Sequence, residues 1–190
     1  MATLDFYNTN AKKYFDTTVN ADMSKQYEIF LKYVKENGRI LDFGCGSGRD
    51  AMHFKEMGYQ VDAIDGSEEL CKLAREYTGI DVRCMNFLDF ESKEEYDGIW
   101  ACASLLHLKK PELIDVLKRL RDGLKVDGYL YTSMKNGTGE EVTPDGKYYI
   151  YLPSDEFITL SENAGLQIVE THSTKSVSNP NETRYWNNFV

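Results

Sequence analysis

Three glycines within five residues are the first feature that suggests chemistry. Gly44, Gly46 and Gly48 follow a short predicted strand, 39–43, and precede a segment with helical spacing. Glycine tolerates positive φ angles and lets a ligand approach the backbone closely. A helix that begins just beyond such a loop also offers free N–H groups. The loop alone predicts a close ligand contact and does not identify the ligand.

An acidic residue at the end of the next apolar run extends the pattern. Asp65 lies 65 − 44 = 21 residues after the first glycine. At this spacing a carboxylate can accept hydrogen bonds from both hydroxyls of a ribose. The pair predicts an adenosine-containing cofactor. The alternative is a glycine-rich turn beside an Asp that caps a helix.

Two further residues distinguish between cofactors. The dinucleotide fingerprint G-x-G-x-x-G would need a glycine at position 49, where this chain has Arg49. Asp42, two residues before Gly44, is unfavourable beside a pyrophosphate and favourable beside the ammonium group of a methionine moiety. The residues therefore favour S-adenosylmethionine over NAD. A nicotinamide-dependent oxidoreductase and a non-catalytic S-adenosylmethionine-binding module remain the alternatives.

Several segments resemble motifs of the class I S-adenosylmethionine-dependent methyltransferases. Residues 40–48 resemble the first motif of that family, 63–67 the second and 96–107 the fourth, and 124–128 resemble its Leu-Lys-Pro-Gly-Gly turn. The likeness covers about residues 38–170. Gly-Arg-Asp at 48–50 is also similar to small bacterial enzymes of the tellurite-resistance type. The resemblance implies S-adenosylmethionine as cofactor and S-adenosylhomocysteine as product.

The same resemblance implies which residues bind the cofactor. It places Asp42, Gly44, Cys45 and Gly46 at the methionine portion, Asp65, Gly66 and Ser67 at the ribose, Asn86 and Phe87 at the adenine, Ala101 after the fourth strand, and Tyr14 near the sulfonium. The alternative for Tyr14 is a place in the core. Because Ala101 replaces the Asn or Asp of an Asn-Pro-Pro-Tyr type motif, N-methylation of DNA bases is disfavoured.

A second group of residues is predicted to contact the methyl acceptor. His107 follows the fourth strand and is the candidate proton acceptor, or else a surface or packed histidine. The long segment 135–153 is interpreted as a substrate lid, with an exposed hairpin as the alternative. Tyr7, His107, Lys135 and Tyr148 are the candidate acceptor contacts. No Cys or His spacing predicts a metal site.

Composition limits the class of protein. The 190 residues suit a single domain, and 22 basic against 31 acidic residues give a net charge of −9. This charge disfavours nucleic acid as a partner and favours a small-molecule acceptor. No apolar run is long enough to span a membrane, and no secretory signal is recognisable. With four dispersed cysteines, a cytoplasmic location is expected. Nothing in the sequence specifies an oligomeric state.

Apolar periodicity predicts the elements that position these residues. The expected helices cover about 7–15, 27–34, 49–57, 67–77, 111–124 and 154–164, and the expected strands cover 39–43, 59–64, 80–85, 96–103, 129–134, 166–171 and 184–190. This order predicts an α/β, Rossmann-like fold with a seven-stranded, mostly parallel sheet, helices on both faces and an antiparallel C-terminal strand pair. Residues 1–190 divide into an N-terminal helical cover (1–37), a cofactor-binding core (38–134), the lid (135–153) and a C-terminal helix with the strand pair (154–190).

Overall fold

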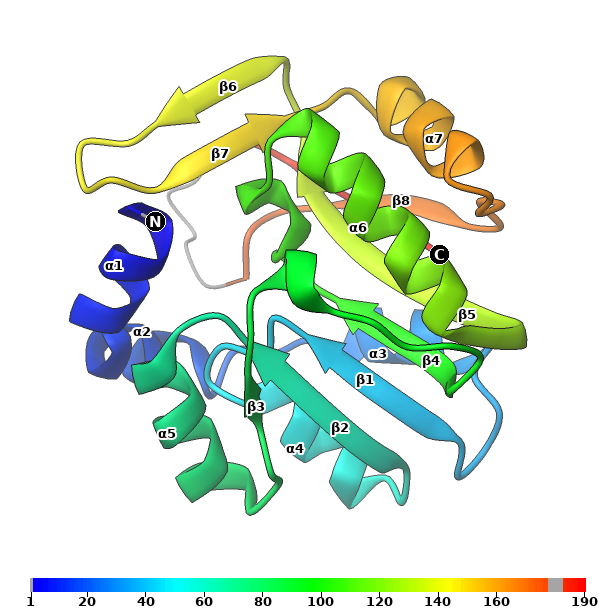
Figure 1. The fold of residues 1–190 in the computed structure, drawn as a ribbon, viewed down its shortest axis with the longest axis horizontal. Helices are drawn as coiled ribbons and strands as arrows, with labels where there is room; N and C mark the ends of the chain where they lie inside the picture. Colours follow the sequence, from blue (N-terminus) through cyan, green and yellow to red (C-terminus); the bar gives the residue numbers. More distant parts are fainter. Residues whose placement is uncertain (1, 178–182) are drawn as a thin grey trace.

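The computed structural model describes residues 2–177 and 183–190. Its main sheet has seven strands in the order β3-β2-β1-β4-β5-β9-β8 (Figure 1). The first five are parallel, whereas β9 is antiparallel to both β5 and β8. The strands span, in chain order, β1 (Arg39–Phe43), β2 (Gln60–Asp65), β3 (Arg83–Cys84), β4 (Tyr96–Ala101), β5 (Leu124–Lys135), β8 (Thr171–Thr174) and β9 (Trp186–Phe189). The predicted fold class is confirmed.

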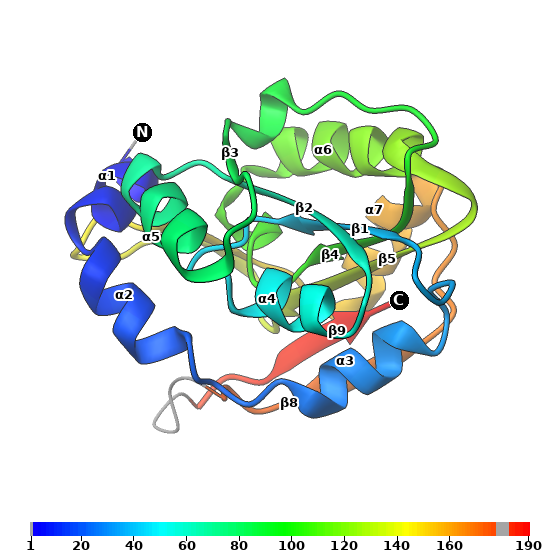
Figure 2. The same ribbon diagram turned by 90° about the horizontal axis from the view of Figure 1, so that it is seen from below.

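Helices cover both faces of this sheet (Figure 2). They are α1 (Ala2–Thr9), α2 (Ala11–Thr18), α3 (Ser24–Leu31), α4 (Arg49–Glu56), α5 (Glu68–Thr78), α6 (Lys110–Gly123) and α7 (Ser154–Asn163), with short 3₁₀ turns η1 (Phe87–Asp89) and η2 (Leu105–His107). One face packs against α6 and α7, and the other against α3, α4 and α5. A separate hairpin, β6 (Gly139–Val142) and β7 (Tyr148–Tyr151), lies beside α1.

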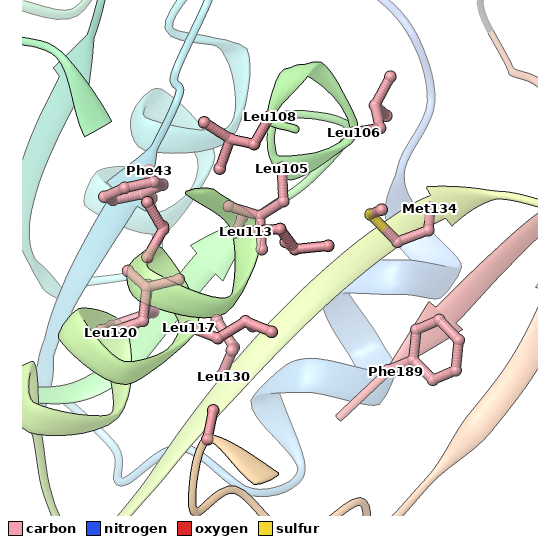
Figure 3. Packing of buried hydrophobic residues seen from close by; sticks show 14 of the residues in the cluster. Phe43, Leu105, Leu106, Leu108, Leu113, Leu117, Leu120, Leu130, Met134 and Phe189 are labelled. Atoms are coloured by element: carbon pink, nitrogen blue, oxygen red, sulfur yellow. The ribbon is translucent and has the colours of Figure 1, made fainter. Parts of the chain in front are cut away.

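Two apolar layers fix the sheet between the helices. The α6 stripe of Leu113, Leu117 and Leu120 is fully buried in the cluster that Figure 3 shows. On the opposite face, Trp100 of β4 stacks on Tyr131 of β5 with ring centroids 4.0 Å apart. Burying a large side chain stabilises the fold by about 1.5–3 kcal/mol. The carboxyl ends of the parallel strands are therefore held in a rigid frame.

The glycine loop between β1 and α4 needs its glycines for steric reasons. Gly44 has φ +84°, and a Cβ atom there would lie 2.5 Å from the Cβ of Ser104. Gly48 has φ +80°, and a Cβ atom there would lie 2.8 Å from Cγ2 of Thr78. A side chain at either position would force the loop away from its neighbours.

Several predicted boundaries differ from those in the structure; the fifth strand, for example, is β5 (Leu124–Lys135) and not 129–134. The predicted helix over 7–15 is two helices, α1 and α2, because the chain leaves helical geometry at Asn10 (φ −109°, ψ 15°). The predicted third strand is only β3, since the chain turns at 80–82 with Val82 N–H bonded to Ile80 O. The strand predicted at 166–171 begins instead at Thr171, although Val169 N–H still bonds to Val190 O. Within 135–153, β6 and β7 form a hairpin in which Ile150 and Tyr151 are buried, and the lid interpretation stays a prediction.

Candidate active site

Two adjoining cavities lie at the carboxyl ends of the parallel strands. The first has a volume of about 440 Å³ and the second about 360 Å³. Five residues line both cavities: Tyr7, Tyr14, Gly44, Ala103 and His107. A larger cavity of about 900 Å³ lies elsewhere, near the start of β5, and none of the predicted site residues lines it. The predicted site therefore corresponds to the two adjoining cavities.

The ribose and adenine candidates gather at the first cavity. Asp65, Gly66, Asn86 and Phe87 all line it. The Asp65 carboxylate accepts hydrogen bonds from the N–H of Gly46 at 2.9 Å and of Ser67 at 2.8 Å. Burial raises the pKa of Asp65 above its usual value. Each carboxylate oxygen has a second lone pair for a ligand donor, so Asp65 fits a ribose diol.

Asn86 and Phe87 form the other wall of this cavity. The Oδ1 atom of Asn86 accepts the N–H of Leu88 at 2.9 Å and so starts the turn η1. The Phe87 ring packs on Phe43 with centroids 4.4 Å apart. The wall thus presents an aromatic ring beside an amide, which suits a flat heterocycle such as adenine.

Helix α1 closes the first cavity through polar contacts. Thr3 Oγ1 accepts the N–H of Tyr148 at 2.9 Å, which joins α1 to β7. Ser67 Oγ donates to Oδ1 of Asn8 at 2.7 Å, which joins α1 to the start of α5. No residue of α1 is buried in the core. The helix is therefore held by contacts with neighbouring segments and not by burial of its side chains in the core.

His107 lies at the junction of the cavities, with both ring nitrogens engaged. Its Nδ1 is 2.8 Å from the carbonyl oxygen of Tyr148, and its Nε2 is 2.9 Å from the Tyr7 hydroxyl. A carbonyl only accepts, so Nδ1 carries the hydrogen and Nε2 accepts from Tyr7. Burial lowers the pKa of His107 to about 4. This arrangement favours the packed-histidine alternative over a proton acceptor.

The second cavity contains a buried ion pair that the sequence did not reveal. Asp50 accepts from Arg49 Nε at 2.6 Å and Nη2 at 2.8 Å, from Trp100 Nε1 at 2.9 Å, and from the Tyr27 hydroxyl. Burial would raise the pKa of Asp50, but Arg49 and these donors lower it below its usual value. Asp50 is thus ionised, and each of its two carboxylate oxygens already accepts two hydrogen bonds. Arg49 forms an ion pair with Asp50, the next residue in the chain. No signal in the sequence identifies Tyr27 and Trp100 as further donors to Asp50.

The acceptor candidates occupy both cavities. Lys135 lines the second cavity, with Nζ 4.5 Å from the ring centroid of Tyr149 and 5.3 Å from that of Trp186. Tyr148 lines the first cavity, whereas Tyr7 lines both. Sequence reasoning missed Tyr149 and Trp186, which also line the second cavity.

Three predicted cofactor residues are not brought to a cavity surface. Asp42 is buried, and its carboxylate accepts the N–H of Ala51 at 2.9 Å in the first turn of α4. Burial and the negative charge of Asp50 raise the pKa of Asp42. Ser67 caps α5 by accepting the N–H of Leu70, and Ala101 is buried within β4. Cys45 lines the second cavity, and Gly46 the first.

Comparisons with known proteins point to methyltransferases. Residues 40–128 match the family model described as a methyltransferase domain. The chain is 28% identical over 158 residues to an uncharacterized methyltransferase of Staphylococcus carnosus, covering 78% of this chain and 75% of that protein. It is 23% identical over 194 residues to the probable S-adenosyl-L-methionine-dependent methyltransferase TehB of Haemophilus influenzae. That match covers 93% of this chain but 65% of TehB.

A solved structure has a similar fold. The 1,6-didemethyltoxoflavin-N1-methyltransferase of Burkholderia thailandensis, with bound S-adenosylhomocysteine, has a TM-score of 0.81 at 19% identity. The match covers 99% of this chain and 86% of that one.

Fold, cavities and matches point to one class of protein. Residues 40–128 match a methyltransferase domain, and the chain is similar over most of its length to proteins named as methyltransferases. The cofactor expected from the glycine loop, S-adenosylmethionine, is the one in the name of TehB, and its product S-adenosylhomocysteine is bound in the Burkholderia structure. In the described part of the chain, no helix has the length and apolar character needed to cross a membrane.

Proposed function

We propose that this chain transfers the methyl group of S-adenosylmethionine to a small-molecule acceptor by in-line displacement. The observation that carries the proposal is the shared wall of the two cavities, formed by Tyr7, Tyr14, Gly44, Ala103 and His107. The first cavity would hold the adenosine portion and the second the acceptor. The methyl group would lie at their junction.

The residues present suit that cofactor. Asp65 would bind the ribose hydroxyls, while Asn86 and Phe87 would contact the adenine. Because Gly44 has no side chain, the methionine portion would fit closely against the backbone there. At the junction, the ring of Tyr14 would face the sulfonium cation. Burial raises the pKa of Tyr14, so its hydroxyl stays neutral there.

Methyl transfer at this junction needs alignment more than proton transfer. When bound, S-adenosylmethionine would supply an electrophilic methyl group, and its sulfur would leave as a neutral thioether. An acceptor lone pair would form the new bond to the methyl carbon as the carbon–sulfur bond breaks. Holding the acceptor in line supplies most of the catalysis. His107 and Tyr7, bonded to each other, would shape the junction and exclude water from it.

A small acceptor agrees with the size of the second cavity and with the charge of the chain. About 360 Å³ accommodates a metabolite, and a net charge of −9 disfavours nucleic acid. All four cysteines are free thiols, which supports a cytoplasmic location.

Calorimetry and a turnover screen test the proposal. We expect S-adenosylhomocysteine to bind far more tightly than NAD, and the reverse order would refute it. A metabolite extract incubated with methyl-labelled cofactor should then give a labelled product. Tight S-adenosylhomocysteine binding without any labelled product would instead support the non-catalytic binding module.

A further inference from the structure

Two cysteines from different elements meet beside the ribose end of the first cavity. Cys71 lies near the start of α5 and Cys84 ends β3, and these two elements lie side by side (Figure 1). The Sγ atom of Cys71 is 4.0 Å from the carbonyl oxygen of Arg83, the residue before Cys84. The two cysteine side chains also hydrogen-bond to each other. This contact brings the two thiols within reach of disulfide formation.

Both thiols also hold the backbone of residues 65–67, the ribose loop. Cys71 Sγ donates to the carbonyl oxygen of Asp65 at 3.4 Å, and Cys84 Sγ donates to that of Gly66 at 4.0 Å. Cys84 is, in addition, the register partner of Asp65 where β3 pairs with β2. Asp65 and Gly66 both line the first cavity. The thiol pair is therefore directly bonded to the residues proposed to contact the ribose.

The two thiols differ in accessibility and in protonation. Cys84 is exposed, whereas Cys71 is fully buried. Burial, followed by the charges of Asp65 and Cys84, raises the pKa of Cys71 to about 12. A dissolved oxidant therefore reaches Cys84 first, and Cys71 keeps its proton until it reacts. Redox-sensitive cysteines commonly have this arrangement, an accessible thiol next to a second thiol that resolves the first oxidation product.

Cys45 is the competing neighbour of Cys71. Burial raises the pKa of Cys45, and nearby groups that include Cys71 raise it further. Cys45 is only 6% exposed, however, so Cys84 is the most accessible of the three thiols. Oxidation that begins at Cys84 therefore favours a bond to Cys71 over a bond between Cys71 and Cys45.

We propose that Cys71 and Cys84 are a redox modification site, at which hydrogen peroxide forms a disulfide and weakens cofactor binding. The Cys84 sulfur attacks the O–O bond of the peroxide, which gives a sulfenic acid and one water. The Cys71 sulfur then attacks the sulfenic sulfur, and the hydroxyl group leaves with the Cys71 proton as a second water. One peroxide is reduced as two thiols are oxidised, so no other reactant is needed.

The disulfide alters the ribose loop because it removes two hydrogen-bond donors. A disulfide has no S–H group, so the carbonyls of Asp65 and Gly66 lose the bonds from the two thiols. The Asp65 carbonyl keeps the N–H of Met85 at 3.0 Å, which holds β2 beside β3. The loop should thus loosen at Gly66 while the sheet stays paired. The effect on the cofactor rests on the proposed function, because it takes the first cavity as the cofactor site.

Mass spectrometry and calorimetry test this site together. Trypsin places the two cysteines on separate peptides, since Lys72 and Arg83 lie between them. After treatment with hydrogen peroxide at neutral pH, we expect a cross-link between these two peptides. We also expect the Kd for S-adenosylhomocysteine to rise at least about threefold, the effect of one weak hydrogen bond. Dithiothreitol should restore the Kd, which separates a disulfide from the oxidation of methionine.

Three serine variants assign the roles of the thiols. Cys84→Ser keeps a donor at an exposed position, so it should bind S-adenosylhomocysteine as the reduced wild type does and should not respond to peroxide. Cys71→Ser should form no cross-link and should instead accumulate a sulfenic acid at Cys84, which dimedone labels. Cys102→Ser is the matched control, because it removes a cysteine of the second cavity and should still form the cross-link between Cys71 and Cys84.

Four results would overturn the inference. They are the absence of a Cys71–Cys84 cross-link within one chain, a cross-link from Cys71 to Cys45 in its place, an unchanged Kd in the cross-linked protein, and a peroxide response that persists in Cys84→Ser. Each of these, with normal S-adenosylhomocysteine binding by the reduced protein, refutes only the redox site. Reduced protein that binds no S-adenosylhomocysteine would refute the proposed function itself.

Discussion

Substitution of Asp65 by alanine tests the cofactor site most directly. In the structure, the two carboxylate oxygens hold the N–H groups of Gly46 and Ser67. The proposed function assigns their remaining lone pairs to the two ribose hydroxyls. Asp65→Ala therefore removes two bonds to the ligand and two bonds within the loop.

The expected loss follows from these bonds. A hydrogen bond to a charged group contributes about 1.5–3 kcal/mol, and about 1.4 kcal/mol corresponds to a factor of ten in Kd. Loss of one ribose contact should weaken S-adenosylhomocysteine binding about tenfold, and loss of both about a hundredfold. The freed loop N–H groups should lower the free energy of unfolding by about 1–3 kcal/mol. Calorimetry measures the first effect, and urea unfolding the second.

Asp62→Ala is the matched control. Asp62 lies on the same strand, but its carboxylate accepts from Arg39 Nε at 2.7 Å and does not line the cavity. Its substitution should leave the Kd unchanged. If folded Asp65→Ala protein binds S-adenosylhomocysteine as the wild type does, the ribose is held elsewhere and the reasoning fails.

Three further predictions concern the junction and the loop. Tyr7→Phe removes the donor to His107 Nε2, so α1 should open more often and its amides should exchange about 5- to 100-fold faster with deuterium; unchanged exchange would contradict the contact. Because the pKa of His107 is lowered from 6.5 to about 4, the unfolded chain takes up a proton that the folded chain does not. The free energy of unfolding should therefore fall as the pH drops from 6.5 towards 4, by about 3 kcal/mol from this group, and His107→Gln should flatten that slope in urea titrations. Asp42 has a raised pKa, so its ionised form opposes folding at neutral pH; Asp42→Asn should raise the melting temperature at pH 7, and the gain should vanish below about pH 4.

The sequence was sufficient where the determinants are local. Gly44 and Asp65 lie 21 residues apart in one strand-helix-strand unit, and parallel strands necessarily end at the same edge of the sheet. The position of the cofactor candidates followed from that rule. The same holds for Asn86, which comes directly after the next strand.

Other features depend on contacts between distant segments. The Tyr7–His107 bond joins residues 100 positions apart, and Asp50 collects donors from α3 and β4. No spacing rule predicts such meetings, because they depend on how helices pack over the sheet. The burial of Asp42 could not be predicted for a related reason. Strand periodicity indicates which face of the sheet a side chain occupies. It does not indicate that the N–H of Ala51 in α4 will donate a hydrogen bond to the Asp42 carboxylate.

The attachment of α1 by hydrogen bonds has a practical consequence for turnover. None of its residues belongs to the buried core, so the helix can detach while the sheet and its apolar layers stay intact. Spent cofactor would then leave through a local opening of small free-energy cost, and not through unfolding of the domain. Ala2 itself lines the first cavity. An affinity tag fused ahead of Ala2 would therefore sit at the exit, and kinetic measurements call for a tag at the other end of the chain.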